Sequence, residues 1–483
     1  MRRSLVVAGA ALVLSAAHAQ AQGSAVMTHS SCATAMGAAG VARPCDDGSA
    51  ILFNPGAIAG QPSVLGVGWT GIRTSGGFTY DITGETIERE AATASVPFGF
   101  ASKRLGSRFA AGIGVFAPYG LGLEWPVCDA ASPRCEGTSF EGRFASYRTE
   151  LRNIYIQPTV AFQATPWLSV GAGLDVVRAS IAIDQRLDLA TQIVRDPATG
   201  APRLLPGGDT VRLANLGIPS GTDFADASLA GDGTGLTFNV GAVARVSEQL
   251  SLGVRYMHRA EIEYDGTAEF TPVGTGLTLG PRNPLGAPAG TPVDLLVAPQ
   301  FTSGALQNGD ISTTLTLPAQ LVVGAAFRPI PSLLLLGDYQ WTSWEDFDQA
   351  TIDFANATSP DQALILDYQN ASTFRLGGEL GATDALALRA GFIYNTAAER
   401  EASVSPLLPE AERYYYSAGI GYRLPMGLGV DLGYQFIDQA DRRGRVRGRT
   451  SLSQTAEQLN VGVYHADASV FNVTLSYRFG GRR

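Results

Sequence analysis

The chain has few of the residues on which enzymes depend. Its 483 residues include 4 histidines and 4 cysteines, and only 16% of them are charged. No Ser–His pair with a third, orienting group can be nominated, so we expect no enzyme. The cysteines form no CxxC pair and have only His29 nearby, so neither a metal site nor a cofactor is expected. A net charge of −9 argues against nucleic acid as a partner.

Long apolar runs are also missing beyond the N-terminus. No later window offers about 18 consecutive apolar residues, so a membrane-spanning helix is not expected. If the mature chain enters a membrane, it must do so as a closed β-barrel, since only helices and closed barrels satisfy every backbone group in lipid. Arg2 and Arg3, a short apolar stretch and small residues around Ala19 and Ala21 predict a signal peptide over residues 1–21.

Export through this signal would place the four cysteines in an oxidising compartment. Cys32, Cys45, Cys128 and Cys135 are therefore disulfide candidates. Pairing of sequence neighbours is preferred, but four cysteines allow three connectivities and the sequence leaves them open.

Alternation of apolar and polar residues is the clearest pattern that is present. In residues 470–479, Phe471, Val473, Leu475 and Tyr477 share one face, and Asn472, Thr474 and Ser476 share the other. Such a period of two indicates a strand between lipid and a wet lumen. About fourteen such segments lie near 62–74, 88–103, 107–118, 146–164, 167–184, 234–247, 250–265, 312–328, 332–346, 370–381, 384–396, 412–424, 427–440 and 468–479. The predicted fold class is an all-β transmembrane antiparallel barrel.

The connections between these segments alternate between short and long. Short ones lie near 105–106, 165–166, 247–248, 329–330, 383–384 and 425–426, and long ones cover about 119–145, 185–233, 266–311, 347–369, 397–411 and 441–467. Short periplasmic turns and long outer loops produce this alternation in bacterial outer-membrane barrels. We expect residues 62–483 to form such a barrel and to contact the surrounding outer-membrane lipid and lipopolysaccharide. The barrel assembly machinery would insert it, and it is expected to act as a monomer.

Residues 22–61 do not alternate and are rich in Ala, Gly and turn formers. About forty residues are too few for a stable independent domain. A barrel of fourteen strands would be wide enough to leak if it were empty. The segment is therefore predicted to fold inside the lumen as a hatch, or plug.

Several motifs resemble one known family. Residues 46–50 (DDGSA) precede 53–57 (FNPGA), and further matches are 117–125 (APYGLGLEW), 156–161 (IQPTVA), 315–319 (LTLPA), 340–344 (QWTSW), 367–370 (DYQN) and 388–392 (LRAGF). Together they resemble the FadL family of outer-membrane transporters of long-chain fatty acids and other hydrophobic compounds. The family's Asn-Pro-Ala motif is Asn-Pro-Gly here.

The resemblance implies a kinked third strand that opens the barrel wall sideways. That strand is 108–116, in which Phe109, Gly112 and Gly114 are gate candidates. The glycines permit a bulge or a close backbone approach, although ordinary lumen-facing glycine is the alternative. The resemblance places the hatch motif Asn54, Pro55 and Gly56 beside the opening, where the Asn54 side chain would satisfy exposed backbone groups.

Ligand capture is assigned to the two longest loops, 185–233 and 266–311. Their apolar residues include the ligand candidates Leu213, Leu216, Phe224, Leu295 and Phe301. Exposed apolar side chains are costly unless they cluster or bind something, and mutual packing of the loops is the alternative. Arg389 is a candidate for pairing a carboxylate head group, with solvation of a wet lumen as the alternative.

The resulting prediction is a channel for passive uptake of long-chain fatty acids or of aromatic or aliphatic hydrocarbons. Ligand would bind at the outer loops, move the hatch and leave sideways through a gap at the third strand. A general porin and a structural or adhesive barrel are the alternatives, and a structural barrel has no need of a hatch.

Overall fold

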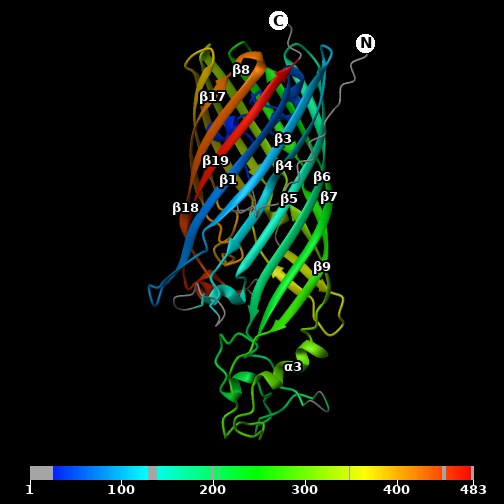
Figure 1. The fold of residues 1–483 in the computed structure, drawn as a ribbon, viewed down its shortest axis with the longest axis vertical. Coiled ribbons are helices and arrows are strands. Elements are labelled where there is room, and N and C mark those ends of the chain that lie inside the picture. The colour runs from blue at the N-terminus through cyan, green and yellow to red at the C-terminus, as the bar shows by residue number, and fades with distance from the viewer. Residues whose placement is uncertain are drawn as a thin grey trace, which may run out of the picture.

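The computed structural model describes residues 26–128, 139–196, 199, 201–205, 207–347, 349–448 and 453–479. The predicted signal peptide, the first residues of the predicted hatch and Cys135 lie outside these ranges. Among the residues described, no helix is both long enough and apolar enough to cross a membrane. The strands form one antiparallel barrel, with the long loops gathered at one end and α3 among them (Figure 1).

The strands are β1 (Ser63–Tyr80), β2 (Thr86–Glu88), β3 (Ala92–Leu105), β4 (Phe109–Glu124), β5 (Arg148–Gln163), β6 (Leu168–Leu187), β7 (Ala225–Arg245), β8 (Leu250–Met257), β9 (Ala260–Pro272), β10 (Gly309–Leu317), β11 (Gln320–Ile330), β12 (Leu333–Thr342), β13 (Gln349–Phe354), β14 (Gln362–Ile365), β15 (Ala371–Gly381), β16 (Leu386–Asn395), β17 (Arg413–Arg423), β18 (Leu428–Gly444) and β19 (Gly462–Phe479). The helices are α1 (Ser31–Ala35), α2 (Ala50–Phe53), α3 (Asp294–Thr302) and α4 (Ala456–Leu459), with 3-10 turns η1 (Pro55–Gly60), η2 (Glu141–Phe144), η3 (Leu213–Leu216), η4 (Trp344–Asp346) and η5 (Pro425–Gly427).

The predicted fourteen-stranded barrel is confirmed. Four barrel strands are each interrupted once and so carry two labels (β8 with β9, β10 with β11, β12 with β13, β14 with β15), and β2 only extends a hairpin, which leaves a 14-strand closed barrel. The first and last strands close it, since β1 pairs with β19 from Ser63↔Phe479 to Tyr80↔Gly462. At this seam neither terminal strand has an unpaired edge in the lipid. Several strands run further outward than predicted, so the second long loop is confined to 188–224.

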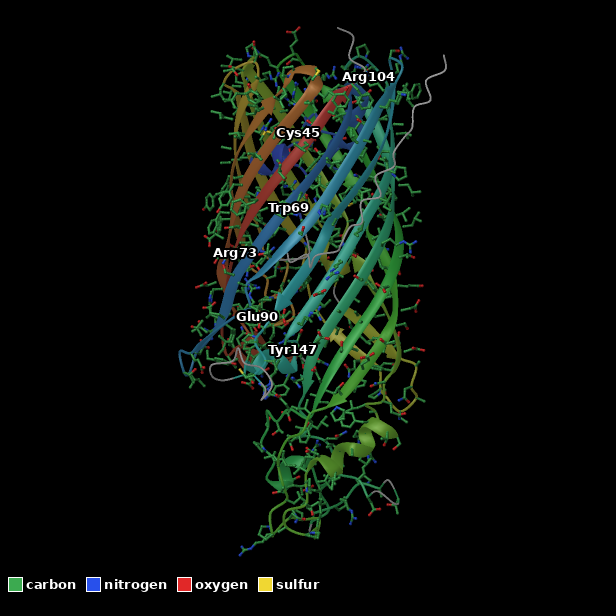
Figure 2. The ribbon with its side chains drawn as sticks, viewed as in Figure 1. Cys45, Trp69, Arg73, Glu90, Arg104 and Tyr147 are labelled. Carbon is green, nitrogen blue, oxygen red and sulfur yellow. A yellow bond between two sulfur atoms is a disulfide. The ribbon has the colours of Figure 1, made fainter. Side chains whose placement is uncertain are left out.

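The outer surface shows why the strands alternate. On β1, the outward side chains Leu65, Val67 and Trp69 are exposed and apolar. Figure 2 shows Trp69 on this surface between Arg104, near the end with the short turns, and Arg73, nearer the long loops. An outward-facing apolar band is typical of a barrel in a bilayer. On β7 the belt ends after Leu236, because the next outward residues are Thr234 and Asp232, so the barrel projects beyond it.

Residues 26–61, which we call the plug, lie within the barrel. Figure 1 shows this segment (blue) enclosed by the strands, in the half nearer the short turns. The N-cap residue of α1, Ser30, accepts a hydrogen bond from the Ala33 amide, and Asn54 likewise caps η1 through the Gly56 amide. Most plug side chains are buried against strands, including Ile51 and Ile58. A barrel interior that buries apolar residues in this way is packed rather than open.

Candidate functional site

The wall of the barrel is incompletely paired between β3 and β4. Their register runs only from Leu105↔Phe109 to Gly99↔Val115. Beyond it, β3 continues to Ala92 in register with β1 alone, and β4 continues to Glu124 in register with β5 alone. The Glu90 amide donates to the Glu124 carbonyl at 3.1 Å and closes the far end. This unpaired stretch, residues 92–98 of β3 facing 116–124 of β4, is called the wall gap.

The irregularity of β4 coincides with the wall gap. The register of β4 with β5 shifts between Phe116 and Tyr119, around Pro118. Proline has no amide to give to a ladder and favours edges and bulges. The open edge of β4 therefore begins where its sequence cannot sustain regular pairing on both sides.

The plug occupies this open edge. The Val26 amide donates to the Pro118 carbonyl at 2.8 Å, and the Ala117 amide donates to His29 Nε2 at 3.0 Å. The imidazole also lies between the two sides of the wall gap, with ring centroids 6.1 Å from Phe98 of β3 and 6.0 Å from Phe116 of β4. His29 thus replaces the missing strand pair with one hydrogen bond and two edge-on ring contacts.

The protonation state of His29 is fixed by its surroundings. The side chain is fully buried, and burial lowers its pKa to about 4. Its Nε2 accepts a hydrogen bond and must therefore carry a lone pair. The neutral form is the one that seals the wall gap.

A series of aromatic rings crosses the lumen from the wall gap. Ring centroids are 5.9 Å apart for both Phe100–Phe116 and Phe116–Tyr155, 6.4 Å for Tyr119–Tyr155 and 6.3 Å for Tyr119–Trp344. We call these five residues the aromatic layer. It belongs to one continuous buried apolar cluster that also contains plug residues.

The far side of the aromatic layer is held by hydrogen bonds at one interrupted strand. The strand formed by β10 and β11 is interrupted at Pro318, whose carbonyl accepts a hydrogen bond from the Tyr119 hydroxyl at 2.8 Å. Gln320 Nε2 donates to the same hydroxyl at 2.8 Å. Tyr119 of β4 is therefore anchored across the lumen by a backbone carbonyl at the strand interruption and by a glutamine side chain next to it.

A narrow apolar pocket opens on the loop side of the aromatic layer. Its lining comprises residues of β6, β7, β9, β10, β13 and β14, most of them inward-facing: Ile181, Ile183, Leu229, Ala230, Gly231, Tyr264, Gly266, Ile311, Ser312, Thr313, Leu315, Ala350, Ile352 and Leu364. None of these side chains is charged. Tyr264, Leu315 and Ala350 also belong to the buried cluster of the aromatic layer. The arrangement suits an apolar ligand with few polar contacts, and we call it the lumenal pocket.

The hatch motif lies away from the wall gap. Asn54 Nδ2 donates to the carbonyls of Ala242 (3.0 Å) and Val254 (3.3 Å), on β7 and β8. A Cβ added to Gly56 would lie 2.7 Å from the Gly241 carbonyl oxygen, and the Pro55 backbone lies against β6. The strand carbonyls that Asn54 bonds belong to β7 and β8. The role at the opening falls to His29.

The three gate candidates on the third strand, β4, face different sides of the barrel wall. Phe109 is 56% exposed on the outer surface, at the end of β4 that is paired with β3. Gly112 and Gly114 also lie in the paired part, and both face the plug. An added Cβ would lie 2.8 Å and 3.0 Å from Ile51 side-chain atoms, respectively. Because these glycines have no Cβ, the plug residue Ile51 can pack directly against the wall. The wall gap begins just beyond them.

The ligand candidates of the outer loops mostly pack on one another. Leu213 and Phe224 are buried in a loop cluster against which Leu216 and Phe301 also pack, whereas Leu295 is 63% exposed. None of the five lines the lumenal pocket.

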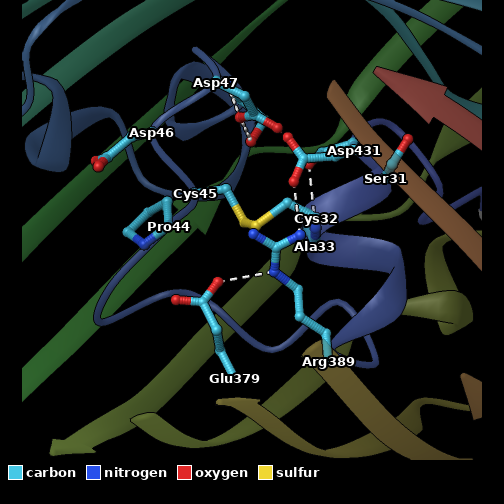
Figure 3. Close-up of a disulfide and its surroundings, with 12 residues drawn as sticks. Ser31, Cys32, Ala33, Pro44, Cys45, Asp46, Asp47, Glu379, Arg389 and Asp431 are labelled. Carbon is cyan, nitrogen blue, oxygen red and sulfur yellow. Dashed lines mark hydrogen bonds and ion pairs between the residues drawn. A yellow bond between two sulfur atoms is a disulfide. The ribbon is translucent and has the colours of Figure 1, made fainter. Parts of the chain in front are cut away.

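Arg389 is engaged inside the barrel close to the plug disulfide (Figure 3). It bonds Glu379 Oε2 at 2.7 Å and Asp431 Oδ1 at 2.6 Å. Cys32 and Cys45 are joined by a disulfide, and Cys128 is disulfide-bonded as well. With its charge compensated twice, Arg389 holds the barrel wall beside the plug and is not part of the lumenal pocket.

Sequence reasoning missed His29 and the aromatic layer. The available signals were Pro118 within an alternating segment and the aromatic residues Phe98, Phe100 and Phe116 on the inward face of their strands. Inward aromatic residues in a lumen predicted to be wet break the expected pattern.

Comparison with known proteins identifies relatives over nearly the whole chain. The family described as "Outer membrane protein transport protein (OMPP1/FadL/TodX)" matches residues 12–479. Outer membrane protein P1 of Haemophilus influenzae is 25% identical over 382 residues, covering 77% of this chain and 72% of that protein. The long-chain fatty acid transport protein of Escherichia coli K12 is 23% identical over 354 residues, covering 72% and 71%.

Solved structures share the fold. A Pseudomonas aeruginosa FadL homologue superimposes with a TM-score of 0.75 at 21% identity, covering 95% of this chain and 100% of that one. The Ralstonia pickettii toluene transporter TbuX does so with a TM-score of 0.61 at 18% identity, covering 94% and 99%.

Proposed function

Because the chain belongs to the OMPP1/FadL/TodX family of outer membrane transport proteins, a family of uptake channels for hydrophobic compounds, we propose that it carries small lipophiles from the lumenal pocket to the wall gap. The predicted family, outer-membrane location and non-enzymatic role are thereby confirmed. The loop, hatch and exit steps remain proposals, as do contacts with lipopolysaccharide and the assembly machinery, and the monomeric state.

One observation carries the route. The buried apolar cluster is continuous from Ala350 and Leu315 at the lumenal pocket, through the aromatic layer, to Phe98 at the wall gap. An apolar molecule moving along it stays out of water, which otherwise costs about 25 cal/mol per Å² of exposed apolar surface. The outer loops would collect ligand at the mouth, and movement of the plug that withdraws His29 from β4 would uncover the exit into the bilayer.

The plug favours this function over a general porin. It fills the lumen with buried residues and is fixed to the walls by side chains such as Asn54 and Gln157, whose Nε2 donates to the Ile51 carbonyl at 2.8 Å. A wide aqueous path for sugars and ions is therefore not expected. Relatives named for fatty acid and for toluene transport make both compound classes reasonable probes.

Uptake of labelled oleate and toluene tests the proposal, in a host that lacks its own carrier. Ala350→Arg would place a charge in the lumenal pocket and is expected to abolish uptake of both. Ala363→Arg is the matched control, because Ala363 is exposed on the neighbouring strand β14. Equal uptake by the two variants, or uptake of sugars with ion conductance in planar bilayers, would contradict the route.

A further inference from the structure

The loop between β16 and β17, residues 396–412, is largely buried. Val404 and Leu408 are buried, and within the loop only Arg400 and Glu401 are exposed. Loops normally run over the surface, because their backbone groups need water or another partner. A loop that is buried over most of its length must therefore have found partners elsewhere in the molecule.

The middle of this loop reaches distant strands. Around the closed sheet, several strands separate β16 and β17 from β4 and β6 in either direction. Trp125, which directly follows β4, nevertheless donates from Nε1 to the Pro406 carbonyl at 3.0 Å. The next residue, Leu407, packs against the cluster of the aromatic layer and against a second cluster, which holds Ile183 and Leu229 of the lumenal pocket. The loop therefore extends across the lumen.

The loop lies on the outer side of the aromatic layer. Ala398 and Leu408 line one small cavity together with Trp344 of that layer. Val404 belongs to another buried cluster, in which it packs with Trp125 and other aromatic residues near the outer ends of the strands. A molecule that passes from the outer mouth to the aromatic layer therefore meets this loop.

The two ends of the loop are joined by a pair of buried glutamates. Glu410 Oε2 accepts hydrogen bonds from the Ala398 amide at 2.8 Å and from the Glu399 amide at 2.9 Å. Glu399 Oε2 in turn accepts one from the Glu410 amide at 3.1 Å. Compact loops whose ends are held close together in this way behave as units and are frequently functional. Residues 399–410 are thus a closed unit on a narrow base.

The contacts that hold this unit in place are few and individually weak. On β18, Gln439 Nε2 donates to the Pro409 carbonyl at 3.0 Å, and Arg442 Nη2 donates to the Glu399 carbonyl at 3.0 Å. Both of these bonds lie at the base, whereas Trp125 holds the middle. A segment attached by a few bonds opens at a lower free energy than the strands around it.

We propose that residues 396–412 form an inner lid, which closes the outer side of the lumenal pocket and swings about its glutamate base to admit each ligand. This inference rests on the proposed function and concerns how ligand reaches the pocket. Movement of the lid takes Leu407 off the pocket residues, whereas movement of the plug opens the wall gap. The pocket then lies between two separate movable elements.

Locking the lid tests the proposal directly. Asn460 Nδ2 donates to Glu401 Oε1 at 3.1 Å, which ties the exposed turn of the lid to the neighbouring loop. In the double variant Glu401→Cys with Asn460→Cys, a short bifunctional methanethiosulfonate reagent can join the two thiols. Uptake of labelled oleate and toluene should then fall to the level of cells with an empty vector, and dithiothreitol should restore it.

The matched controls are the two single-cysteine variants and the wild type, each given the same reagent and reductant. Recovery after reduction shows that the locked protein was folded and inserted. If the locked variant takes up both probes as fast as the single-cysteine variants, the loop is a fixed part of the barrel and the lid is refuted while the route stands. If the wild type takes up neither probe faster than the empty vector, the proposed function fails as well.

Loosening the lid gives a second test that does not depend on uptake. Trp125→Phe keeps a ring but removes the donor to the Pro406 carbonyl. Hydrogen exchange of peptides from residues 399–410 should become roughly five-fold faster, as expected for the loss of one hydrogen bond. Trp167→Phe is the matched control, because Trp167 is 54% exposed on the outer surface. Unchanged exchange in Trp125→Phe would overturn the proposal, since the lid would then not be held closed across the lumen.

Discussion

Removal of the His29 ring is the most direct way to weaken the seal of the wall gap. In His29→Ala, the Ala117 amide loses its acceptor at 3.0 Å, and Phe98 and Phe116 lose the ring that lies between them. The backbone of β4 is otherwise unchanged. The variant therefore tests whether a plug side chain, rather than the strands themselves, closes the wall.

The size of the effect follows from these contacts. An unsatisfied buried amide costs about 1–3 kcal/mol, and each aromatic contact contributes about 0.5–1.5 kcal/mol. Together the closed state should lose about 2–6 kcal/mol relative to the released plug. Even the lower value corresponds to a roughly thirty-fold larger open population.

Hydrogen exchange of the peptides that contain Ala117 and Val26 reports this opening. Both should exchange roughly thirty-fold faster or more in His29→Ala than in the wild type. His465→Ala, a substitution of the half-exposed histidine on β19, is the control for general loosening. Unchanged exchange at Ala117 in His29→Ala would show that the seal does not depend on the imidazole.

The same seal should depend on pH. Since burial lowers the pKa of His29 to about 4 from an ordinary 6.5, the released plug binds the proton more tightly than the closed one. The contribution of neutral His29 to the stability of the closed state is thus fully present above pH 6.5. It is lost as the pH falls towards 4, by roughly 3 kcal/mol in all. His29→Phe keeps a ring but cannot titrate, so its exchange, corrected for the intrinsic rate, should not change over this range. An equal acid response in both proteins would assign it to another group.

Three further substitutions address the attachment of the plug. Replacing Cys32 and Cys45 with Ser opens a loop with a sequence separation of 13 and should cost about 3 kcal/mol, seen as faster hydrogen exchange in residues 26–61 but not in the strands. Arg389→Ala leaves its two carboxylate partners uncompensated and should destabilise the barrel by about 3–5 kcal/mol, measured as a lower temperature of thermal unfolding. Gly171→Ala brings a Cβ to 2.5 Å from the Pro55 backbone and should displace the plug in a protease-protection assay, whereas Gly378→Ala, with its nearest atom at 3.7 Å, should be tolerated.

Much of the barrel was predictable because its signals are local. Each strand shows its two faces within about ten residues, and short turns alternate with long loops along the chain. Residues 26–61 were recognisable as a plug because they lack that alternation. The position of Asn54 was not predictable, since its partners Ala242 and Val254 are distant in sequence and nothing local selects them.

The site depended on contacts that no local pattern encodes. Leu213, Leu216, Phe224 and Phe301 were candidates because they are apolar in long loops, but such residues stabilise loops as readily as they bind ligands. Whether an apolar side chain meets a neighbour or an empty pocket is decided by the packing of several segments together.

By itself, the sequence determined a lipid-embedded cylinder with a folded leading segment, because alternation along each strand follows from having different solvents on its two sides. The tertiary structure alone decided where the cylinder is incomplete and what fills it. His29 meets Phe98 and Phe116 only after the barrel has closed around the plug, and the Tyr119 hydroxyl meets the Pro318 carbonyl only across the lumen. The physical reason is that closure and strand register, rather than the residues of any one strand, set which side chains face each other across the lumen.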